Sequence, residues 1–353
     1  MRVVVLGATG NAGTSVLEAL AREDRVTEVV GAARRLPGAR FEKVSWRKAD
    51  IADPNTDLAG LMRGADCVVH LAWLIQPSRN EAITHATNVE GSQRVFDAVA
   101  RAGVPSLVYA SSVGAYSPGP KDHPVDESWP TTGIDSSFYS RHKAAVERIL
   151  DSFEAAHPGV RVVRLRPGLI FKRAAATGIR RLFAGPFLPS ALVRRDLINV
   201  IPRHPRLVFQ AVHSLDVGDA YRLAIVRDDA RGAYNVAAEP VLDPAELGRI
   251  LGARTVPVPA KLLRLGADVT WRLRLQPTSP GWLDMGLGVP VMDTTRARTE
   301  LGWTPQHTAA EALLELIDGM REGAGSDTPP LSPDTTAPAR VREVVTGVGS
   351  TSR

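Results

Sequence analysis

The sequence has a single cysteine and no long hydrophobic run. Cys67, the only cysteine among 353 residues, excludes an internal disulfide framework and is typical of a reducing compartment. Because it lies within the apolar run "CVVHLA", we expect a buried, unreactive thiol. The opening run "VVVL" is too short for a signal peptide, and no later run reaches membrane length. We therefore expect a soluble, cytoplasmic protein.

Runs of basic residues are also missing, although the chain carries a formal net charge of +5. Neither a basic run nor zinc-ligand spacing marks a nucleic-acid interface, so we expect no nucleic-acid partner and no metal site. A mildly basic surface suits an anionic ligand such as a phosphorylated cofactor. Since 44% of the residues are hydrophobic, the chain can bury a full core, which excludes disorder throughout.

Short β-branched runs alternate with longer helical patterns in the first half of the chain. The strand-like runs are "RVVVL", "VTEVVGA", "CVVHLA", "SLVYAS" and "VRVVRLR". This alternation predicts an α/β fold with a Rossmann-type, doubly wound parallel sheet and helices on both faces. Ligands of such sheets bind at the carboxyl ends of the strands. Polar residues directly after a strand are therefore the candidates for a site.

The alternation ends after Pro167, where Pro, Gly, Arg and Trp become frequent. We assign residues 1–170 to an NAD(P)-binding Rossmann domain, to which segments around 205–236 return, and residues 171–321 mainly to a smaller C-terminal α/β substrate-binding lobe. The segment "KLLRLGADVTWRLRL" fits a basic amphipathic membrane helix, but a solvated helix is the favoured interpretation, and we expect no membrane partner. Residues 322–353 are rich in Ser, Thr, Pro and Gly, which predicts a disordered tail.

A glycine triplet in "LGATGNAG" follows the first strand-like run and opens a helical pattern, which is the context of a dinucleotide-binding fingerprint. Glycine allows a tight turn, a close approach of backbone N–H groups to a pyrophosphate and packing of the helix on the sheet. The alternative is a glycine-rich turn without a ligand. The candidate cofactor-binding residues of this loop are Gly7, Thr9, Gly10, Asn11, Ala12 and Gly13.

The second strand-like run ends without the carboxylate that would hold the ribose 2′-hydroxyl of NAD. Ala33 stands there, and Arg34 and Arg35 follow. Guanidinium groups accommodate a 2′-phosphate, so NADP is favoured as cofactor and NAD stays possible. Asp50 and Ile51 follow the third strand, where the Asp50 carboxylate is either an acceptor for the adenine amino group or part of a simple turn.

Tyr139 and Lys143 in "YSRHK" are i and i+4 on a predicted helix, so they share one face. An ordinary phenol titrates near pH 10, and a nearby ammonium stabilises its anion. Tyr139 is thus a candidate for proton transfer at a carbonyl or hydroxyl oxygen. Ser111 and Ser112 end the preceding strand, where a hydroxyl can donate to a substrate oxygen. We expect His142 to be solvated and not a second base. The alternative interpretation is an ordinary solvated helix face.

Several motifs together resemble one family. "GATGNAG", "HLA", "NVEG", "YASSVGAY", "YSRHK", "RPG", "HSLDVGDA" and "ELGWTP" occur in the order found in the extended short-chain dehydrogenase/reductase family, also called the NAD-dependent epimerase/dehydratase family. The resemblance covers nearly the whole chain except the tail. It implies an enzyme with a Rossmann domain followed by a smaller substrate domain. This enzyme would bind a small-molecule substrate, and a homodimer is a further expectation.

The resemblance also implies roles for individual residues. The family's catalytic triad is Ser or Thr, Tyr and Lys, and its pattern places the serine at Ser112 and not at Ser111, beside Tyr139 and Lys143. Lys143 would also hold the ribose hydroxyls. The remaining residues that the resemblance implies for the cofactor site are Leu71 and Ala72, whose backbone passes the cofactor, Asn88, which supports the active site, and Pro167 in "RPG".

Three departures from the family pattern concern the substrate. Members that dehydrate nucleotide sugars usually carry an Asp-Glu pair after the triad hydroxyl, whereas Val113 and Gly114 stand there, which disfavours 4,6-dehydratase chemistry. The run "RPGLIF" lacks the asparagine common in sugar-nucleotide epimerases. Lys172 replaces a common glycine, so the local loop is expected to differ.

The function predicted from these residues is that of an NAD(P)-dependent oxidoreductase, which transfers hydride at a carbonyl or secondary alcohol carbon. One alternative is an NAD-dependent epimerase of a sugar or sugar nucleotide. A second alternative is a non-catalytic protein that senses NADP. The substrate pocket is expected in the second lobe, where Phe183, Phe187, Trp271 and Trp282 are either core or lining residues.

Overall fold

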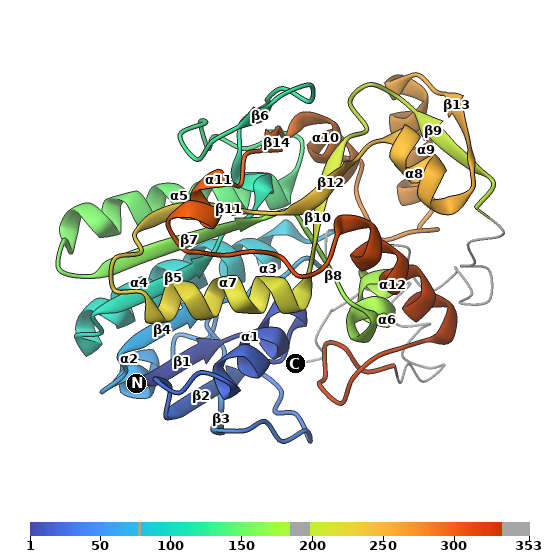
Figure 1. Cartoon of the computed structure of the whole chain (residues 1–353). Coiled ribbons are helices and arrows are strands. Elements are labelled where there is room, and N and C mark those ends of the chain that lie inside the picture. Colours follow the sequence, from blue (N-terminus) through green and yellow to red (C-terminus); the bar gives the residue numbers. More distant parts are fainter. Residues whose placement is uncertain (77–78, 184–197, 334–353) are drawn as a thin grey trace.

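A seven-stranded sheet forms the centre of the structure (Figure 1). The computed structural model describes residues 1–76, 79–183 and 198–333. The strands of the sheet are β1 (Arg2–Leu6), β2 (Glu28–Ala33), β3 (Val44–Lys48), β4 (Cys67–His70), β5 (Ser106–Ala110), β7 (Arg161–Pro167) and β11 (Gly232–Val236). They pair in parallel in the order β11-β7-β5-β4-β1-β2-β3. The direction of the order reverses between β1 and β4, as in a doubly wound Rossmann-type sheet, which confirms the predicted fold class.

Both faces of the sheet are buried. In β1, Val3 and Val5 belong to a hydrophobic cluster on one face, and Val4 and Leu6 belong to a cluster on the other face. Successive side chains of a strand point to opposite faces, so a run such as "RVVVL" contributes to both clusters. This explains why the strands read as continuous apolar runs without alternation.

Helices cover the two faces of this sheet (Figure 1). They are α1 (Asn11–Ala21), α2 (Leu58–Met62), α3 (Glu81–His85), α4 (Gly91–Ala102), α5 (Phe138–Ala156) and α7 (Ser214–Val226). α1 and α7 pack together on one face, where Leu17 and Tyr221 join the first cluster. On the other face, Phe96 of α4 and Leu150 of α5 join the second cluster. Both α7 and β11 lie within the segment 205–236, which was predicted to return to the first domain.

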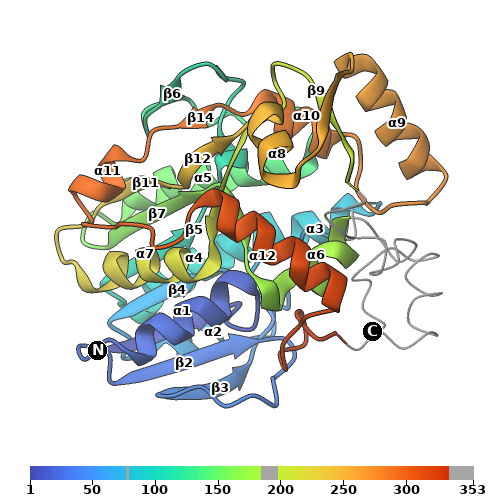
Figure 2. The same ribbon diagram turned by 45° about the vertical axis from the view of Figure 1, so that its right-hand side comes forward.

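A smaller sheet, β12-β10-β8, forms the centre of the C-terminal part. Its strands are β8 (Leu169–Phe171), β10 (Phe209–His213) and β12 (Ala238–Leu242), and α6 (Ala176–Phe183) and α12 (Ala309–Glu322) pack beside it. Figures 1 and 2 show α6 and α12 side by side, in agreement with their contacts. Phe171 and Ala211 of the sheet and Leu316 of α12 belong to the buried cluster between this sheet and the two helices. This part of the chain therefore combines strands and helices, as predicted.

The remaining elements surround these two sheets. Strands β9 (Val200–Arg203) and β13 (Arg254–Pro257) form one pair, and β6 (Pro124–Val125) and β14 (Val291–Met292) form another. The helices are α8 (Pro244–Leu251), α9 (Ala260–Arg272), α10 (Gly281–Gly288) and α11 (Thr295–Thr299). Only α10 reaches the candidate site described below.

The predicted boundary of a disordered tail at residue 322 is too early. Residues 322–333 continue from α12 and pack against α6, where the backbone N–H and the hydroxyl of Thr177 both donate to the carbonyl oxygen of Ala324. Leu331 is buried. Hydrogen bonds to α6 and the buried Leu331 side chain thus hold a segment that is otherwise rich in Ser, Thr, Pro and Gly. Residues 334–353 of the predicted tail lie outside the described residues.

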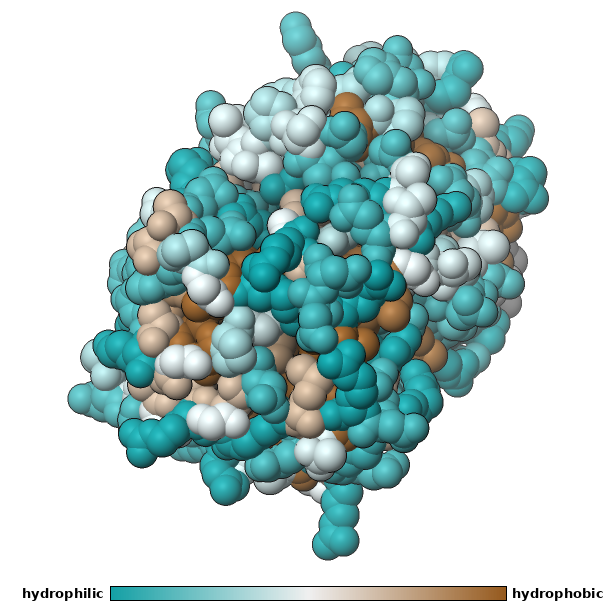
Figure 3. All heavy atoms as spheres, turned by 60° about the vertical axis from the view of Figure 1, so that its left-hand side comes forward, coloured by the Kyte–Doolittle hydropathy of each residue, from teal (hydrophilic) through white to brown (hydrophobic). Residues whose placement is uncertain are grey.

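Within the described ranges, none of the helices is both long and apolar enough to cross a bilayer. The predicted amphipathic segment forms α9, and all of its residues are described and none is buried. Leu262 and Leu265 of this helix are more than half exposed, and the interpretation as a solvated helix stays a prediction. The face shown in Figure 3 is mainly hydrophilic, with hydrophobic residues in groups between the hydrophilic ones.

Candidate active site

The glycine loop lies at the point where the strand order of the large sheet reverses. Gly7, directly after β1, has a φ of +81°, and a Cβ on it would lie 2.7 Å from the backbone nitrogen of Ala72, after β4. A Cβ on Gly13 would meet the carbonyl oxygen of Gly7 and the backbone of Ala8. Glycine is thus required at both positions for close backbone packing. The loop and the residues after β4 together form the crevice in which doubly wound sheets bind ligands.

The N-terminus of α1 is open to an anion. Gly10 is the N-cap residue and, as a glycine, offers no side chain to the first backbone N–H groups of the helix. A Cβ on Gly10 would meet nothing closer than the Gly7 carbonyl oxygen at 3.5 Å. Asn11 donates from Nδ2 to the Ile170 carbonyl oxygen, and its Oδ1 is buried without a hydrogen-bond partner among the described residues. Free N–H groups at a helix N-terminus fit a pyrophosphate, so the loop suits a dinucleotide.

Two arginines follow β2, and a third approaches them from α6. Arg34 and Arg35 are exposed, and the preceding Ala33 is buried. Burial, together with the charges of Arg34 and Arg181, lowers the pKa of Arg35. Arg34 and Arg181 therefore both lie near Arg35. A cluster of like charges of this kind favours an anionic ligand.

Asp50 forms a turn at the end of β3. Its Oδ1 accepts a hydrogen bond from the backbone N–H of Ala52 at 3.0 Å. The sequence left two interpretations of Asp50 open, a simple turn and an acceptor for the adenine amino group. The hydrogen bond to Ala52 shows the turn. One carboxylate oxygen of Asp50 is thereby engaged within the loop, while Ile51 is buried behind it against Gly91.

Asn88 holds the segment after β4 in place. It lies in a single turn of π-helix (Ala86–Glu90), a form often found at functional sites. Its side chain accepts from the backbone N–H of Leu74 at 2.7 Å and donates to the carbonyl oxygen of Leu74 at 2.8 Å. Ser92 links the Asn88 carbonyl oxygen to the buried ring of His70. Burial lowers the pKa of His70 to about 3, so this histidine is neutral near pH 7.

Ser112, Tyr139 and Lys143 come together at the carboxyl end of β5. Tyr139 lies in the first turn of α5, which Ser137 caps, and the phenol lies near the Ser112 side chain. Ser112 Oγ also accepts from the backbone N–H of Gly114 at 3.0 Å. The Lys143 ammonium donates to the Ala110 carbonyl oxygen, the last residue of β5, at 2.6 Å.

Burial disfavours the charged forms of both Tyr139 and Lys143 in the free protein. Burial raises the pKa of the Tyr139 phenol, and the nearby Ser112 side chain offsets part of this effect. Burial also lowers the pKa of the Lys143 ammonium well below its usual value, against the attraction of the Glu147 carboxylate. The phenol is therefore protonated in the free protein. Its position near the N-terminus of α5 favours negative charge when the proton leaves.

Ser111 has a different environment from Ser112. Its hydroxyl donates to Glu147, a fully buried carboxylate one turn after Lys143 on α5. Arg164 and Arg166 of β7 hold the same carboxylate, with nitrogen to oxygen distances of 2.8 Å and 2.9 Å. These charges lower the pKa of Glu147 to about 2 although burial alone raises it. Ser111 thus belongs to a buried ion-pair network behind the site.

Aromatic side chains enclose Tyr139. The ring of Trp282 on α10 lies 4.8 Å from the Tyr139 ring, centroid to centroid, at an interplanar angle of 37°. The ring of Trp73, just after β4, meets Tyr139 edge-on at 5.9 Å. Phe183 at the end of α6 packs against Trp282. Phe183 and Trp282 therefore lie at the site, and the predicted Phe187 lies outside the described residues.

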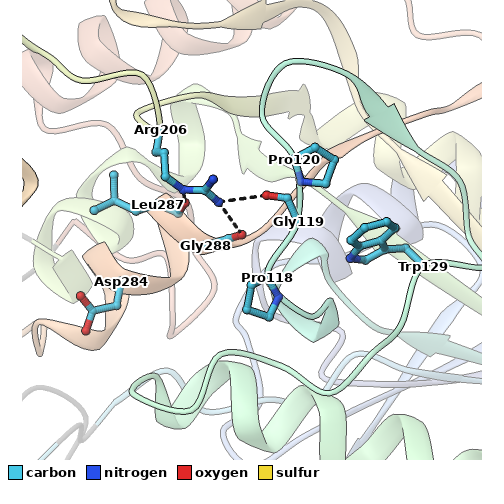
Figure 4. A pocket seen from close by; sticks show the side chains of 8 residues that line it. All are labelled: Pro118, Gly119, Pro120, Trp129, Arg206, Asp284, Leu287 and Gly288. Carbon is cyan, nitrogen blue, oxygen red and sulfur yellow. Dashed lines mark hydrogen bonds between the residues drawn. The ribbon is translucent and has the colours of Figure 1, made fainter.

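A recess of about 620 Å³ lies beside α10 (Figure 4). Trp282, the residue of α10 that contacts Tyr139, does not line it. Asp284, Leu287 and Gly288 of α10 line it, together with Pro118, Gly119, Pro120, Trp129 and Arg206. Arg206 donates to the carbonyl oxygens of Leu287, Gly288 and Gly119. Cations near a helix C-terminus satisfy its last carbonyl groups. Arg206 thus fixes the end of the helix that carries Trp282.

His142 differs from its predicted environment. His142 was expected to be solvated, but it is buried against Phe138 and His85, with Nε2 3.3 Å from a Glu81 oxygen. Burial lowers its pKa to about 4, because α3 covers this face of α5. Lys172 was expected to make its local loop differ from the family pattern, and this stays a prediction. Its ammonium is buried and donates to hydroxyls of α1 at 2.7 Å and 2.9 Å.

Comparisons with known proteins give the family of this chain and agree with the fold described above. The model of the NAD-dependent epimerase/dehydratase family matches residues 3–237. The chain therefore belongs to this family of enzymes, as the sequence motifs predicted. Its structure is similar to that of MoeE5, solved in complex with UDP-glucose and NAD, with a TM-score of 0.68, 22% identity and coverage of 91% of this chain and 99% of that chain. At this identity the likeness shows the fold.

Two curated relatives give the extent of the similarity in sequence. An uncharacterized protein of Mycobacterium tuberculosis is 29% identical over 331 residues, which are 92% of this chain and 31% of that protein. The chain thus spans about a third of the length of that relative. The sterol-4-alpha-carboxylate 3-dehydrogenase (decarboxylating) of Saccharomyces cerevisiae is 30% identical over 146 residues, 40% of this chain and 41% of that protein.

Sequence reasoning missed several contributors to the site. Trp73 follows the motif "HLA" directly, so its position after β4 was a usable signal. Arg206 comes from a distant segment whose local sequence carries no sign of the contact. Trp282 was expected to be a core or lining residue, but its contact with Tyr139 was not predicted. Their role follows only from the packing of α10 against Tyr139.

Proposed function

We propose that the protein is an NAD(P)-dependent oxidoreductase that reduces a carbonyl group or oxidises a secondary alcohol. The observation that carries the proposal is the meeting of Ser112, Tyr139 and Lys143 at the carboxyl end of β5, on the same edge of the sheet as the glycine loop. Polar groups that converge at this edge are typical of active sites in doubly wound sheets. The yeast relative named above is a dehydrogenase by name, which supports the same reaction class.

Each residue of the triad has a distinct role in proton transfer. In carbonyl reduction, the Tyr139 hydroxyl donates its proton to the carbonyl oxygen as negative charge develops there. Ser112 Oγ accepts from the N–H of Gly114, which leaves its own proton for Tyr139 or for the substrate oxygen. The charge of Lys143 stabilises the phenolate that results. The nicotinamide cofactor, when bound, donates or accepts the hydride.

The cofactor is held by Gly7, Gly10 and Gly13, with the pyrophosphate at the N-terminus of α1. We favour NADP over NAD. The three neighbouring guanidinium groups of Arg34, Arg35 and Arg181 support this choice, because they offer several charge-assisted hydrogen bonds to a 2′-phosphate. The solved relative MoeE5 was crystallised with NAD, so the preference distinguishes this chain from it.

The test begins with titration of the protein with NADPH and NADH, followed by a screen of aldehydes and ketones for loss of nicotinamide absorbance. We expect tighter binding of NADPH and a loss of absorbance with at least one carbonyl compound. An altered sugar without net absorbance change would point to an epimerase. Binding of NADPH without any turnover that depends on Tyr139 would point to a sensor.

A further inference from the structure

Trp73 contacts both members of the predicted proton-transfer pair. The Lys143 Nζ lies over the Trp73 ring, 3.5 Å from its centroid. The Tyr139 ring meets the same indole edge-on at 5.9 Å and 74°. An ammonium at this distance from an aromatic face is attracted by the ring quadrupole, most strongly when both are desolvated. Lys143 is only 3% exposed, so the contact is of this desolvated kind.

The backbone on both sides of Trp73 is fixed. The preceding residue, Ala72, packs against Gly7 without room for a Cβ between them. The following residue, Leu74, is held by two hydrogen bonds to the Asn88 side chain. The indole is therefore placed by the cofactor loop on one side and by the π-helix on the other. Its position over Lys143 follows from the fold and not from a free rotation of a surface loop.

The other groups around Lys143 supply little direct charge. Glu147 on the same helix attracts the ammonium, but this carboxylate is held by Arg164 and Arg166. Tyr109 of β5 presents its ring at 5.3 Å from Nζ. His70 of β4 is neutral near pH 7. The direct contacts of the ammonium described above are thus the Ala110 carbonyl oxygen and the Trp73 face.

We propose that Trp73 is a positioning residue, whose indole face holds the Lys143 ammonium in its charged form beside Tyr139. The inference rests on the proposed function, since it assigns Trp73 a part in the same proton transfer. Trp73 acts through Lys143 and is not itself a donor or acceptor of the proton. An aromatic ring at residue 73 is the property that matters, because the face of the ring and not its size attracts the cation.

Two variants separate the aromatic face from the bulk of the side chain. Trp73→Phe keeps an aromatic ring, and Trp73→Leu is of similar size to Phe but has no π-face. The primary readout is the pKa of Lys143, measured by NMR of the isotopically labelled full chain without cofactor. We expect this pKa to fall by about one unit in Trp73→Leu relative to Trp73→Phe. Trp282→Leu, which alters the packing around Tyr139 and Phe183 but not the ring that lies against the Lys143 ammonium, should leave the pKa of Lys143 unchanged.

Kinetics provide the second readout. In alcohol oxidation the phenol must lose its proton, so kcat rises with pH through the pKa of Tyr139. With a weaker charge at Lys143, we expect this rise to move to higher pH in Trp73→Leu and to return toward the wild-type position in Trp73→Phe. Equal Lys143 pKa values in the Phe and Leu variants would overturn the proposal, and so would a pH profile that neither variant shifts.

The two readouts also separate this inference from the proposed function. If no carbonyl compound or alcohol is turned over, the proposed function fails, whereas the NMR comparison still decides on Trp73. If turnover is found but the Lys143 pKa is the same in all variants, only the positioning role fails. Thermal melting of each variant verifies that it folds. If Trp73→Leu does not fold, Trp73→Ala takes its place as the variant without an aromatic face, and a Lys143 pKa in Trp73→Ala equal to that in Trp73→Phe would overturn the role.

Discussion

Gly7 and Ala72 touch through their backbones, with no space for a side chain between them. A Cβ on Gly7 would lie 2.7 Å from the Ala72 nitrogen and 2.8 Å from its Cα. The two residues follow neighbouring parallel strands, β1 and β4, at the point where the strand order reverses. The glycine motif and the motif "HLA", which are separate in the sequence, thus form the two walls of a single crevice.

Replacing glycines of the loop should separate stability from cofactor binding. In Gly13→Ala the new Cβ would lie 2.4 Å from the Gly7 carbonyl oxygen, so we expect a loss of about 1–3 kcal/mol in the free energy of unfolding. Gly10→Ala meets only an ordinary contact at 3.5 Å and should keep the wild-type melting temperature while it weakens cofactor binding. Thermal melts with and without NADPH measure both effects. A Gly13→Ala protein as stable as wild type would contradict the packing described.

The two neighbouring serines should give different defects. Ser112→Ala removes the hydroxyl beside Tyr139, and we expect kcat to fall about 10²–10³-fold, as when one donor to a developing oxyanion is lost, with little change in stability. Ser111→Ala removes a hydrogen bond to the buried Glu147 and should lower the free energy of unfolding by about 1–3 kcal/mol. Parallel measurements of kcat and urea unfolding test the contrast. The reverse pattern would assign the triad serine to Ser111.

The arginines after β2 should determine cofactor preference. Arg35→Ala removes charge-assisted hydrogen bonds to a 2′-phosphate, so we expect the Kd for NADPH to rise about 10–100-fold. The Kd for NADH should change less than about threefold, because this cofactor has no such phosphate. Arg181→Ala should show the same selective effect, and Arg249→Ala, an exposed arginine paired with Glu246, serves as the control. Equal losses for both cofactors would argue against a 2′-phosphate site.

Acid should weaken the fold through Glu147. The pKa of this carboxyl is lowered to about 2 in the folded protein, below its usual value in unfolded chains of about 4.3. Its contribution to stability is therefore complete above about pH 4.3, on the order of 3 kcal/mol, and is lost as the pH falls toward 2.

Variants of this carboxyl test the acid effect. Glu147→Gln should be less stable than wild type at pH 7, because Arg164 and Arg166 lose their anionic partner. It should also lose less stability than wild type between pH 5 and pH 2. Unfolding in urea at several pH values measures both differences. Glu42→Gln, at an exposed position, is the matched control. A parallel pH dependence of wild type and Glu147→Gln would contradict the assignment.

The sequence predicted the parts of the site that depend on local pattern. Gly7 and Gly13 need glycine because of tight backbone contacts, and Tyr139 and Lys143 share a face because of helix periodicity. The preference for Ser112 over Ser111 came from the family resemblance; in the structure Ser112 lies near Tyr139, whereas Ser111 donates to Glu147. Glycine positions and helix periodicity can be predicted because each depends on a few neighbouring residues of the sequence.

Features that depend on the packing of distant segments were not predicted. His142 was expected to be solvated, but the partner that buries it, α3, precedes it by more than fifty residues in the sequence. Trp282 was named as a core or lining residue, but its contact with Tyr139 was not predicted, because a long and irregular stretch separates α10 from the first domain. Residues 323–333 show the same limit, because composition indicated disorder, whereas the buried Leu331 and hydrogen bonds from Thr177 to Ala324 hold the segment.

The central claim is that Tyr139 transfers the proton in a hydride-transfer reaction. The most direct measurement compares turnover and cofactor affinity in wild type and Tyr139→Phe, with the carbonyl compound identified by the screen. The phenyl ring keeps the packing against Trp282 and Trp73, so the variant should fold and bind NADPH with a Kd within a few fold of wild type. We expect turnover to be abolished. Turnover retained in Tyr139→Phe would contradict the account.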